Sequence, residues 1–313
     1  MNAATELPLV HARGLVKRFG DLVAVDGIDF DVQRGEAFGF LGPNGAGKTS
    51  TMRMVGCVSP PSGGTLSILG LDPVERGAEI RSRLGVVPQQ DTLDMELTVR
   101  ENIVIYGRYF GLPRKELGPR ADELLDFVEL TERANDKVEP LSGGMKRRLT
   151  IARSLVNDPE ILLLDEPTTG LDPQARHVVW DRLYRLKRQG VTLLLTTHYM
   201  DEAEQLCDRL VVMDHGKIVA EGSPRDLIER YSTREVVELR FDDGSRPDDL
   251  GFWTDGLVER VEPLPDRVLL YTDDGDAASH EMHERGLVPD SVLVRRSTLE
   301  DVFLHLTGRS LIE

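Results

Sequence analysis

The 313-residue sequence has few of the features that mark secreted, metal-bound or nucleic-acid-binding proteins. Its two cysteines, Cys57 and Cys207, form no Cys-x-x-Cys pattern and lie near no histidine cluster, which indicates reduced thiols in a cytosolic protein. No apolar run approaches the roughly 20 residues of a membrane-spanning helix. Residues 1–10 lack the basic start and the apolar core of a signal peptide. The formal net charge of -16 disfavours nucleic acid as a partner, because binding its phosphates requires clustered Lys and Arg.

A glycine-rich segment follows the apolar, strand-like residues 37–41. It fits the pattern Gly-x-x-x-x-Gly-Lys-Ser/Thr and reads Gly42-Pro43-Asn44-Gly45-Ala46-Gly47-Lys48-Thr49-Ser50. Residues 51–55 are typical of the first turns of a helix. A strand, a glycine-rich loop and a helix N-terminus form a phosphate cradle, in which backbone N–H groups and the helix dipole attract the anion. Because Lys48 can reach the β- and γ-phosphates and Thr49 can bind Mg²⁺, we expect a nucleoside triphosphate site.

A second apolar run, residues 161–164, ends in two adjacent carboxylates, Asp165 and Glu166. This is the pattern of a buried parallel strand whose carboxyl end meets a ligand crevice. Asp165 can hold Mg²⁺ through water, and Glu166 can polarise an attacking water as a general base. A further strand over residues 191–197 ends at His198, which can hydrogen-bond a γ-phosphate. We interpret the other histidines, including His215, as ordinary.

Two other features each allow a functional and a structural interpretation. Ser142, Gly143 and Gly144 begin a helix that runs to about residue 156, and they form either an anion site or a simple helix cap with a glycine turn. Phe19 lies on the β layer ahead of the phosphate loop, where it either stacks on an adenine ring or packs in the layer. The structural interpretation is the simpler one for each feature taken alone.

The order of the remaining segments predicts an α/β domain with a smaller domain after it. Short apolar runs over residues 13–40 predict an antiparallel β layer, and residues 95–140 predict a helical insertion whose first helix has a capping box of Thr98 and Glu101. Residues 231–313 contain 9 Arg, no Lys and 19 acidic residues, against 29 basic and 35 acidic residues before them. We expect this segment to be a small α+β appendage. Its terminal helix, capped by Thr298, has an apolar face that is either core or a contact with a second copy: Leu299, Val302, Phe303 and Leu306.

Taken together, these motifs resemble the ATP-binding subunit of ABC transporters, over about residues 9–230. A GTPase would need an Asn-Lys-x-Asp guanine reader, and Asn135-Asp136-Lys137 has the wrong order. In the resemblance, residues 42–50 match the Walker A loop and residues 141–145 the signature motif, with Met145 where the family usually has Gln. Asp165 and Glu166 end the Walker B strand. The other matches are Gln89 for the Q-loop, Asp172 for the D-loop, His198 for the switch histidine and Phe19 for the adenine-stacking aromatic.

The resemblance implies a P-loop ABC ATPase fold with a mixed sheet core, an antiparallel β layer and a helical subdomain over about residues 95–160. It implies an ATP-binding domain over residues 1–230 and an accessory domain over residues 231–313. ATP and Mg²⁺ are the implied cofactors, with Thr49, Gln89 and Asp165 near the metal. Two copies would sandwich ATP, so that Ser142, Gly143 and Gly144 of one copy meet the γ-phosphate held by Lys48 of the other. Glu166 would activate water, while His198 and Gln89 would sense the γ-phosphate and the metal.

Residues 86–94, residues 141–148 and the terminal Leu299-Glu300-Asp301-Val302-Phe303-Leu304-x-Leu306-Thr307-Gly308 look like one branch of that family. The branch contains daunorubicin-resistance-type drug exporters and the nodulation lipo-oligosaccharide exporter. It implies a peripheral subunit at the cytoplasmic face of the membrane, which powers efflux through a separate permease. The helices around Tyr106 and residues 91–97 are the expected docking surface. A soluble ABC ATPase of translation or DNA repair and an importer ATPase are the alternatives.

Overall fold

The computed structural model describes residues 7–242, 247 and 249–308, and its backbone divides into two compact units, Met1–Glu221 and Gly222–Glu313. This division lies closer to the N-terminus than the boundary expected at about residue 230. The reason is helix α8 (Pro224–Tyr231), which packs against α11 (Leu299–Thr307) of the second unit. None of the described helices has the length and apolar character needed to span a bilayer.

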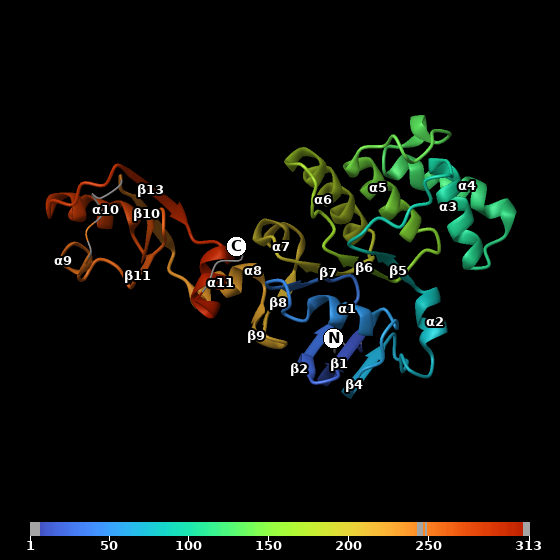
Figure 1. Ribbon diagram of the computed structural model, residues 1–313, viewed down its shortest axis with the longest axis horizontal. Helices are drawn as coiled ribbons and strands as arrows, with labels where there is room; N and C mark the ends of the chain where they lie inside the picture. Colours follow the sequence, from blue (N-terminus) through green and yellow to red (C-terminus); the bar gives the residue numbers. More distant parts are fainter. Residues whose placement is uncertain (1–6, 243–246, 248, 309–313) are drawn as a thin grey trace, which may run out of the picture. The chain divides into compact units, whose positions relative to one another are not determined.

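The first unit is built on a six-stranded sheet with the strand order β5-β6-β7-β3-β8-β9 (Figure 1). Strands β5, β6, β7, β3 and β8 run parallel to their neighbours. Parallel strands covered on both faces are apolar throughout, and β3 and β7 are buried over their whole length. The strands are β3 (Ala37–Leu41), β5 (Leu84–Val87), β6 (Ile161–Asp165), β7 (Thr192–Thr197), β8 (Arg209–Asp214) and β9 (Lys217–Gly222).

A separate three-stranded antiparallel sheet has the order β2-β1-β4. It consists of β1 (Val10–Phe19), β2 (Leu22–Val32) and β4 (Gly63–Ile68). The antiparallel layer predicted over residues 13–40 corresponds to β1 and β2, and β4 is a third strand outside that range. One core joins this layer to the main sheet, with Phe30 of β2 in edge-to-face contact with Phe40 of β3 at 5.1 Å between ring centroids. The layer is thereby fixed against the strand that leads into the glycine-rich loop.

The helical part of the first unit is a cluster of three mutually packed helices, α3, α4 and α5. The predicted capping box at Thr98 and Glu101 is present at the start of α3. The helices of this unit are α1 (Lys48–Val55), α2 (Gly77–Ser82), α3 (Val99–Tyr109), α4 (Arg114–Phe127), α5 (Gly143–Ser154), α6 (Pro173–Arg188) and α7 (Met200–Leu206), with a 3₁₀ turn at Thr131–Arg133. The predicted fold class is confirmed.

The second unit is an antiparallel sheet of order β11-β12-β10-β13 with helices packed on it. The strands are β10 (Glu235–Arg240), β11 (Arg260–Pro263), β12 (Val268–Thr272) and β13 (Ser291–Arg296). Besides α8 and α11, its helices are α9 (Gly251–Thr254) and α10 (Gly275–Glu284). On α11, Leu299, Val302 and Phe303 are fully buried, so the apolar face of this helix belongs to the core.

Candidate active site

The glycine-rich loop connects β3 to α1, which begins at Lys48, three residues earlier than the sequence pattern indicated. Gly47 has a φ of 102°, in the left-handed region that favours glycine. A Cβ at Gly47 would lie 2.4 Å from the Ala24 carbonyl oxygen, and one at Gly42 would lie 2.3 Å from that of Met213. Only glycine therefore allows the loop to wrap closely around the start of α1 and to present its N–H groups.

Lys48 is almost fully buried at the base of this loop, with 4% of its surface exposed. Its Nζ donates to the carbonyl oxygens of Gly42 at 2.6 Å and Pro43 at 3.0 Å. Burial lowers the pKa of Lys48, while the charges of Glu166 and Asp165 oppose that shift. The ammonium group is thus held next to two carboxylates at the carboxyl end of β6.

Asp165 is positioned by hydroxyl groups from two directions. Its Oδ1 accepts a hydrogen bond from Thr196 Oγ1 of β7 at 2.6 Å and lies 3.4 Å from Thr49 Oγ1 of α1. A hydroxyl and a carboxylate oxygen this close together are suitable donors for Mg²⁺, which binds few protein oxygens and keeps several waters. Bound there, the ion would neutralise phosphate charge.

Glu166 follows in a strained conformation, with a φ of 46°, and is 7% exposed. Gln89 Nε2 and Thr169 Oγ1 donate to its Oε2 at 3.0 and 3.1 Å. His198 Nδ1 lies 3.3 Å from Oε1 without the alignment of a hydrogen bond. The pKa of Glu166 is lowered, first by His198 and then by Thr169 and Lys48, against the opposing effect of burial. The carboxylate is therefore ionised at neutral pH and able to accept a proton from water.

A cavity of about 430 Å³ is lined both by the glycine-rich loop and by the antiparallel β layer. Phe19, residues 44–50, Gln89 and Glu166 all line it. The Phe19 ring is 49% exposed, which suits a ring that stacks on a base better than one that packs in a core. His215, in the turn between β8 and β9, also lines the cavity, although it belongs to no recognisable sequence motif. The cavity is within the size range of ligand sites.

Ser142, Gly143, Gly144 and Asp172 do not line this cavity. Ser142 caps α5 by accepting a hydrogen bond from Met145 N at 3.3 Å, and Asp172 caps α6 through Ala175 N at 2.9 Å. A Cβ on Gly144 would lie 2.8 Å from Ala175 Cβ, so the first turns of α5 and α6 lie side by side. Ser142, Gly143 and Asp172 are exposed, so this pair of helix ends forms a surface of its own.

Arg147, on α5, was missed by reasoning from the sequence. The side chain is 5% exposed and donates to four carbonyl oxygens. The acceptors are those of Pro167 at 2.6 Å, Glu166 at 3.0 Å, Asp165 at 3.2 Å and Pro88. Pro88 directly precedes Gln89. The hydrogen bonds of one guanidinium therefore connect α5 both to the segment before Gln89 and to the end of β6. Its acceptors are backbone atoms of distant segments, which leave no pattern in the sequence.

Comparison with known proteins agrees with this geometry. Residues 25–169 match the family model for ABC transporter, and residues 249–308 match that for the C-terminal domain of the nodulation factor export protein NodI. The chain is 47% identical over 308 residues to the Nod factor export ATP-binding protein I of Ralstonia nicotianae, covering 97% of this chain and 95% of that protein. The protein of the same name from Sinorhizobium fredii is 48% identical over 303 residues, covering 96% and 87%.

Solved structures of ATP-binding cassettes show the same fold. The dimeric, post-hydrolysis cassette MJ0796 bound to ADP and Pi has a TM-score of 0.62 and 28% identity, over 68% of this chain and 98% of that one. CbiO1 from Clostridium perfringens, part of the ABC transporter complex cbiONQ, has a TM-score of 0.67 and 28% identity, over 72% and 92%. Fold and site thus define an ATP-binding cassette, which binds ATP with Mg²⁺ and hydrolyses it. The chain belongs to the ABC transporter ATP-binding proteins, in the family of the Nod factor export ATP-binding protein I.

Proposed function

We propose that the chain is the ATP-hydrolysing subunit of an exporter, which works at the cytoplasmic face of the membrane with a separate permease. The observation that supports this proposal is that one chain combines the cavity at the phosphate loop with a C-terminal segment that matches the NodI domain. Relatives that share both parts are named Nod factor export ATP-binding proteins. We propose a lipid, glycolipid or drug-like molecule as the cargo.

The proposed roles at the ATP site follow from the contacts. Phe19 stacks on the adenine, residues 42–50 hold the phosphates, and Thr49 and Asp165 hold Mg²⁺. Gln89 contacts Glu166 directly, at 3.0 Å, which supports a role in sensing the reacting group. Glu166, ionised and held on three sides, takes the proton of the attacking water. His198, next to Glu166, hydrogen-bonds the γ-phosphate.

The assembled site needs a second copy of the chain. Ser142, Gly143 and Asp172 are exposed at the paired starts of α5 and α6, outside the cavity that contains Lys48. Exposed N–H groups at a helix start form an anion site when a phosphate is brought to them. We therefore propose that this surface closes over the ATP bound to the partner, in line with the dimeric cassette of the same fold.

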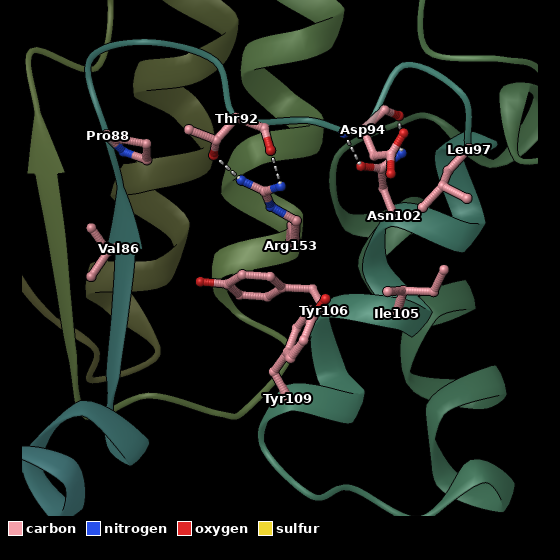
Figure 2. Close-up of a pocket in the computed structure, with 10 residues that line it drawn as sticks. All are labelled: Val86, Pro88, Thr92, Asp94, Leu97, Asn102, Ile105, Tyr106, Tyr109 and Arg153. Carbon is pink, nitrogen blue, oxygen red and sulfur yellow. Dashed lines mark hydrogen bonds between the residues drawn. The ribbon is translucent and has the colours of Figure 1, made fainter.

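Figure 2 shows the groove that we propose as the permease docking surface. It has a volume of about 400 Å³ and lies between β5 and α3. Arg153 donates to the backbone and hydroxyl oxygens of Thr92 and lies over the Tyr106 ring, 4.8 Å from its centroid, while Tyr109 is 82% exposed. Aromatic and arginine side chains in a groove are typical of anchoring points at protein interfaces. The lining residues are Val86, Pro88, Thr92, Asp94, Leu97, Asn102, Ile105, Tyr106, Tyr109 and Arg153.

The groove is connected to the ATP site through few steps. Pro88 lines the groove, its carbonyl oxygen accepts a hydrogen bond from Arg147, and Arg147 also holds the carbonyl of Glu166. If the docked permease displaces Pro88, Arg147 moves with it, and the backbone of Glu166, which Arg147 also holds, is displaced in turn. We propose this path as the coupling between transport and hydrolysis.

The test is affinity purification of the tagged chain from cells that co-express a candidate multi-span permease. We expect the chain to co-purify with that permease in the membrane fraction, and Tyr109→Ala to weaken the complex while the isolated chain keeps its ATPase activity. A matched control is Tyr184→Ala, since Tyr184 is exposed on α6, outside the groove. Sedimentation with ribosomes and no association with the permease would instead favour a soluble ATPase of translation.

A further inference from the structure

The second unit contains a cavity of its own, of about 340 Å³. It is formed where the end of α8 and the residues after it meet β11, β12 and α11. The lining residues are Arg230, Tyr231, Ser232, Thr233, Glu259, Arg260, Tyr271 and His305. All of them belong to the unit Gly222–Glu313. The cavity is therefore separate from the ATP site and from the groove of Figure 2.

Two arginines distinguish this cavity from the rest of the unit. Among the described arginines of residues 222–308, all but two lie within 4.0 Å of a carboxylate oxygen. The two exceptions are Arg230 and Arg260, and both line the cavity. This is unexpected in a unit, residues 222–313, that has 21 acidic residues against 11 arginines, so that a carboxylate partner is easy to find. Among the residues that line the cavity, Glu259 is the one acidic residue, and it is exposed.

Arg260 is fixed in position without being neutralised. Its guanidinium lies 3.8 Å from the centroid of the buried Tyr271 ring, and its Nη1 contacts His305 Nδ1. The pKa of His305 is lowered by burial first and by Arg260 next, so the imidazole is neutral and accepts the hydrogen bond. The Tyr271 hydroxyl donates away from the cavity, to Asp301 at 3.1 Å. Arg260 Nη2 is buried and has no hydrogen-bond partner in the described structure.

A buried guanidinium N–H without an acceptor is costly, and an oxyanion is the group that best removes this cost. The planar fork of arginine binds phosphate and carboxylate groups bidentately. Ser232 and Thr233 also line the cavity, but their hydroxyls donate to Ser297 Oγ at 3.1 Å and to the Glu235 carbonyl at 2.9 Å, which leaves the two arginines as the anion donors. The cavity is large enough for a small metabolite. We propose that this cavity binds a small molecule through a phosphoryl or carboxylate group held by Arg230 and Arg260, as a second ligand site that belongs to the unit without the ATP site.

Two measurements on the full chain test this site. Crystals soaked in tungstate, a tetrahedral oxyanion with strong anomalous scattering, are expected to show a peak at Arg230 and Arg260 as well as one at the phosphate loop. In solution, the Lys48→Ala variant removes the main phosphate contact of the ATP site. Inorganic phosphate and citrate are then titrated into this variant by calorimetry, and the better of the two identifies the anion class.

Arg230→Gln, made in the Lys48→Ala background, is expected to weaken binding of that anion about tenfold or more, because a charge-assisted hydrogen bond is lost. Arg230 is exposed, so this change leaves folding intact, whereas Arg260→Gln is expected to abolish binding. Arg225→Gln is the matched control, since Arg225 is on the same helix and pairs with Glu229. A tungstate peak at the phosphate loop alone, or equal affinities in the Arg230 and Arg225 variants, would overturn the proposal.

Discussion

Each unit of the protein contains a fully buried carboxylate, and the two differ in the charge of their partners. Asp301 of the second unit is 1% exposed and accepts hydrogen bonds from the Arg295 guanidinium at 2.7 and 2.9 Å. Glu202 of the first unit is 0% exposed and accepts from the neutral donors Thr168 and Trp180 at 2.7 and 3.2 Å. Burial raises the pKa of both groups, but the hydrogen bonds of Arg295 and Thr298 bring that of Asp301 below its ordinary value. The pKa values of the two carboxylates thus shift in opposite directions, and the guanidinium partner of Asp301 accounts for the difference.

A second comparison, between Asp301 and Glu166, distinguishes a structural carboxylate from a catalytic one. Asp301 joins β13, β12 and the start of α11 through Arg295, Tyr271 and Thr298, and the described contacts occupy both of its oxygens. Glu166 in the ATP site is also ionised, but its partners are the polar groups of Gln89, Thr169 and His198, and it faces a cavity. A carboxylate fixed by an arginine pair stabilises the fold, whereas one next to a cavity remains available for chemistry.

The largest effect is expected from Asp301→Ala. The change leaves Arg295 and the Tyr271 hydroxyl without their buried partner, so the free energy of unfolding should fall by about 3 kcal/mol or more. Urea unfolding of the full chain measures the loss, and ATPase activity per folded molecule should be retained. Asp274→Ala, which removes an exposed cap of α10, is the control and should cost about 1 kcal/mol. Equal losses in the two variants would contradict the role given to Asp301.

Glu166→Gln should act in the opposite way, on activity rather than stability. The amide keeps the shape of the side chain but accepts a proton poorly, so we expect ATPase activity to fall roughly 10²-fold or more. Steady-state phosphate release measures this loss. Binding of ATP should persist, and the variant should accumulate as a dimer with ATP in size-exclusion chromatography. Normal turnover would show that another group is the base.

The sequence predicted the strand that ends in Asp165 and Glu166 and the terminal helix that carries Asp301, but not the helix that carries Glu202 or the contacts of these carboxylates. The phosphate loop, the strand ending at Asp165 and the Thr98 capping box depend on neighbouring residues, so local patterns were sufficient. Arg147 lies at the site because of how α5 packs, and His215 lies there because β8 is next to β3 in the sheet. Neither arrangement can be read from a local sequence pattern. The short elements α9 and β11 were also missed, because four residues are too few to establish a periodicity.

Arg147→Gln tests whether contacts of that kind matter for catalysis. Losing donors to the carbonyls of Pro88, Asp165, Glu166 and Pro167 should lower kcat about tenfold with little change in KM, because ATP is bound by other residues. Arg147→Lys should not restore kcat, since one ammonium cannot span carbonyls that a planar guanidinium reaches. Arg148→Gln is the control, because Arg148 donates to Val128 O at 2.7 Å, away from the site. An unchanged kcat in Arg147→Gln would remove Arg147 from the coupling path.

The smallest effect is expected from Glu202→Gln, and it depends on pH. Because the pKa of Glu202 is raised in the folded state, the unfolded chain loses this proton first as the pH rises above about 4.5. Stability from this group is therefore present at or below that pH and is lost as the pH rises through the folded pKa. The glutamine is neutral throughout and can still accept from Thr168 and Trp180, so its stability should not share that decline. Urea unfolding of both proteins between pH 5 and pH 8 should show a difference that grows in favour of the variant, by about 1 kcal/mol. A constant difference across this range would mean that Glu202 is ionised in the folded state like Asp301, and that burial with neutral donors is not enough to keep a carboxyl group protonated in this fold.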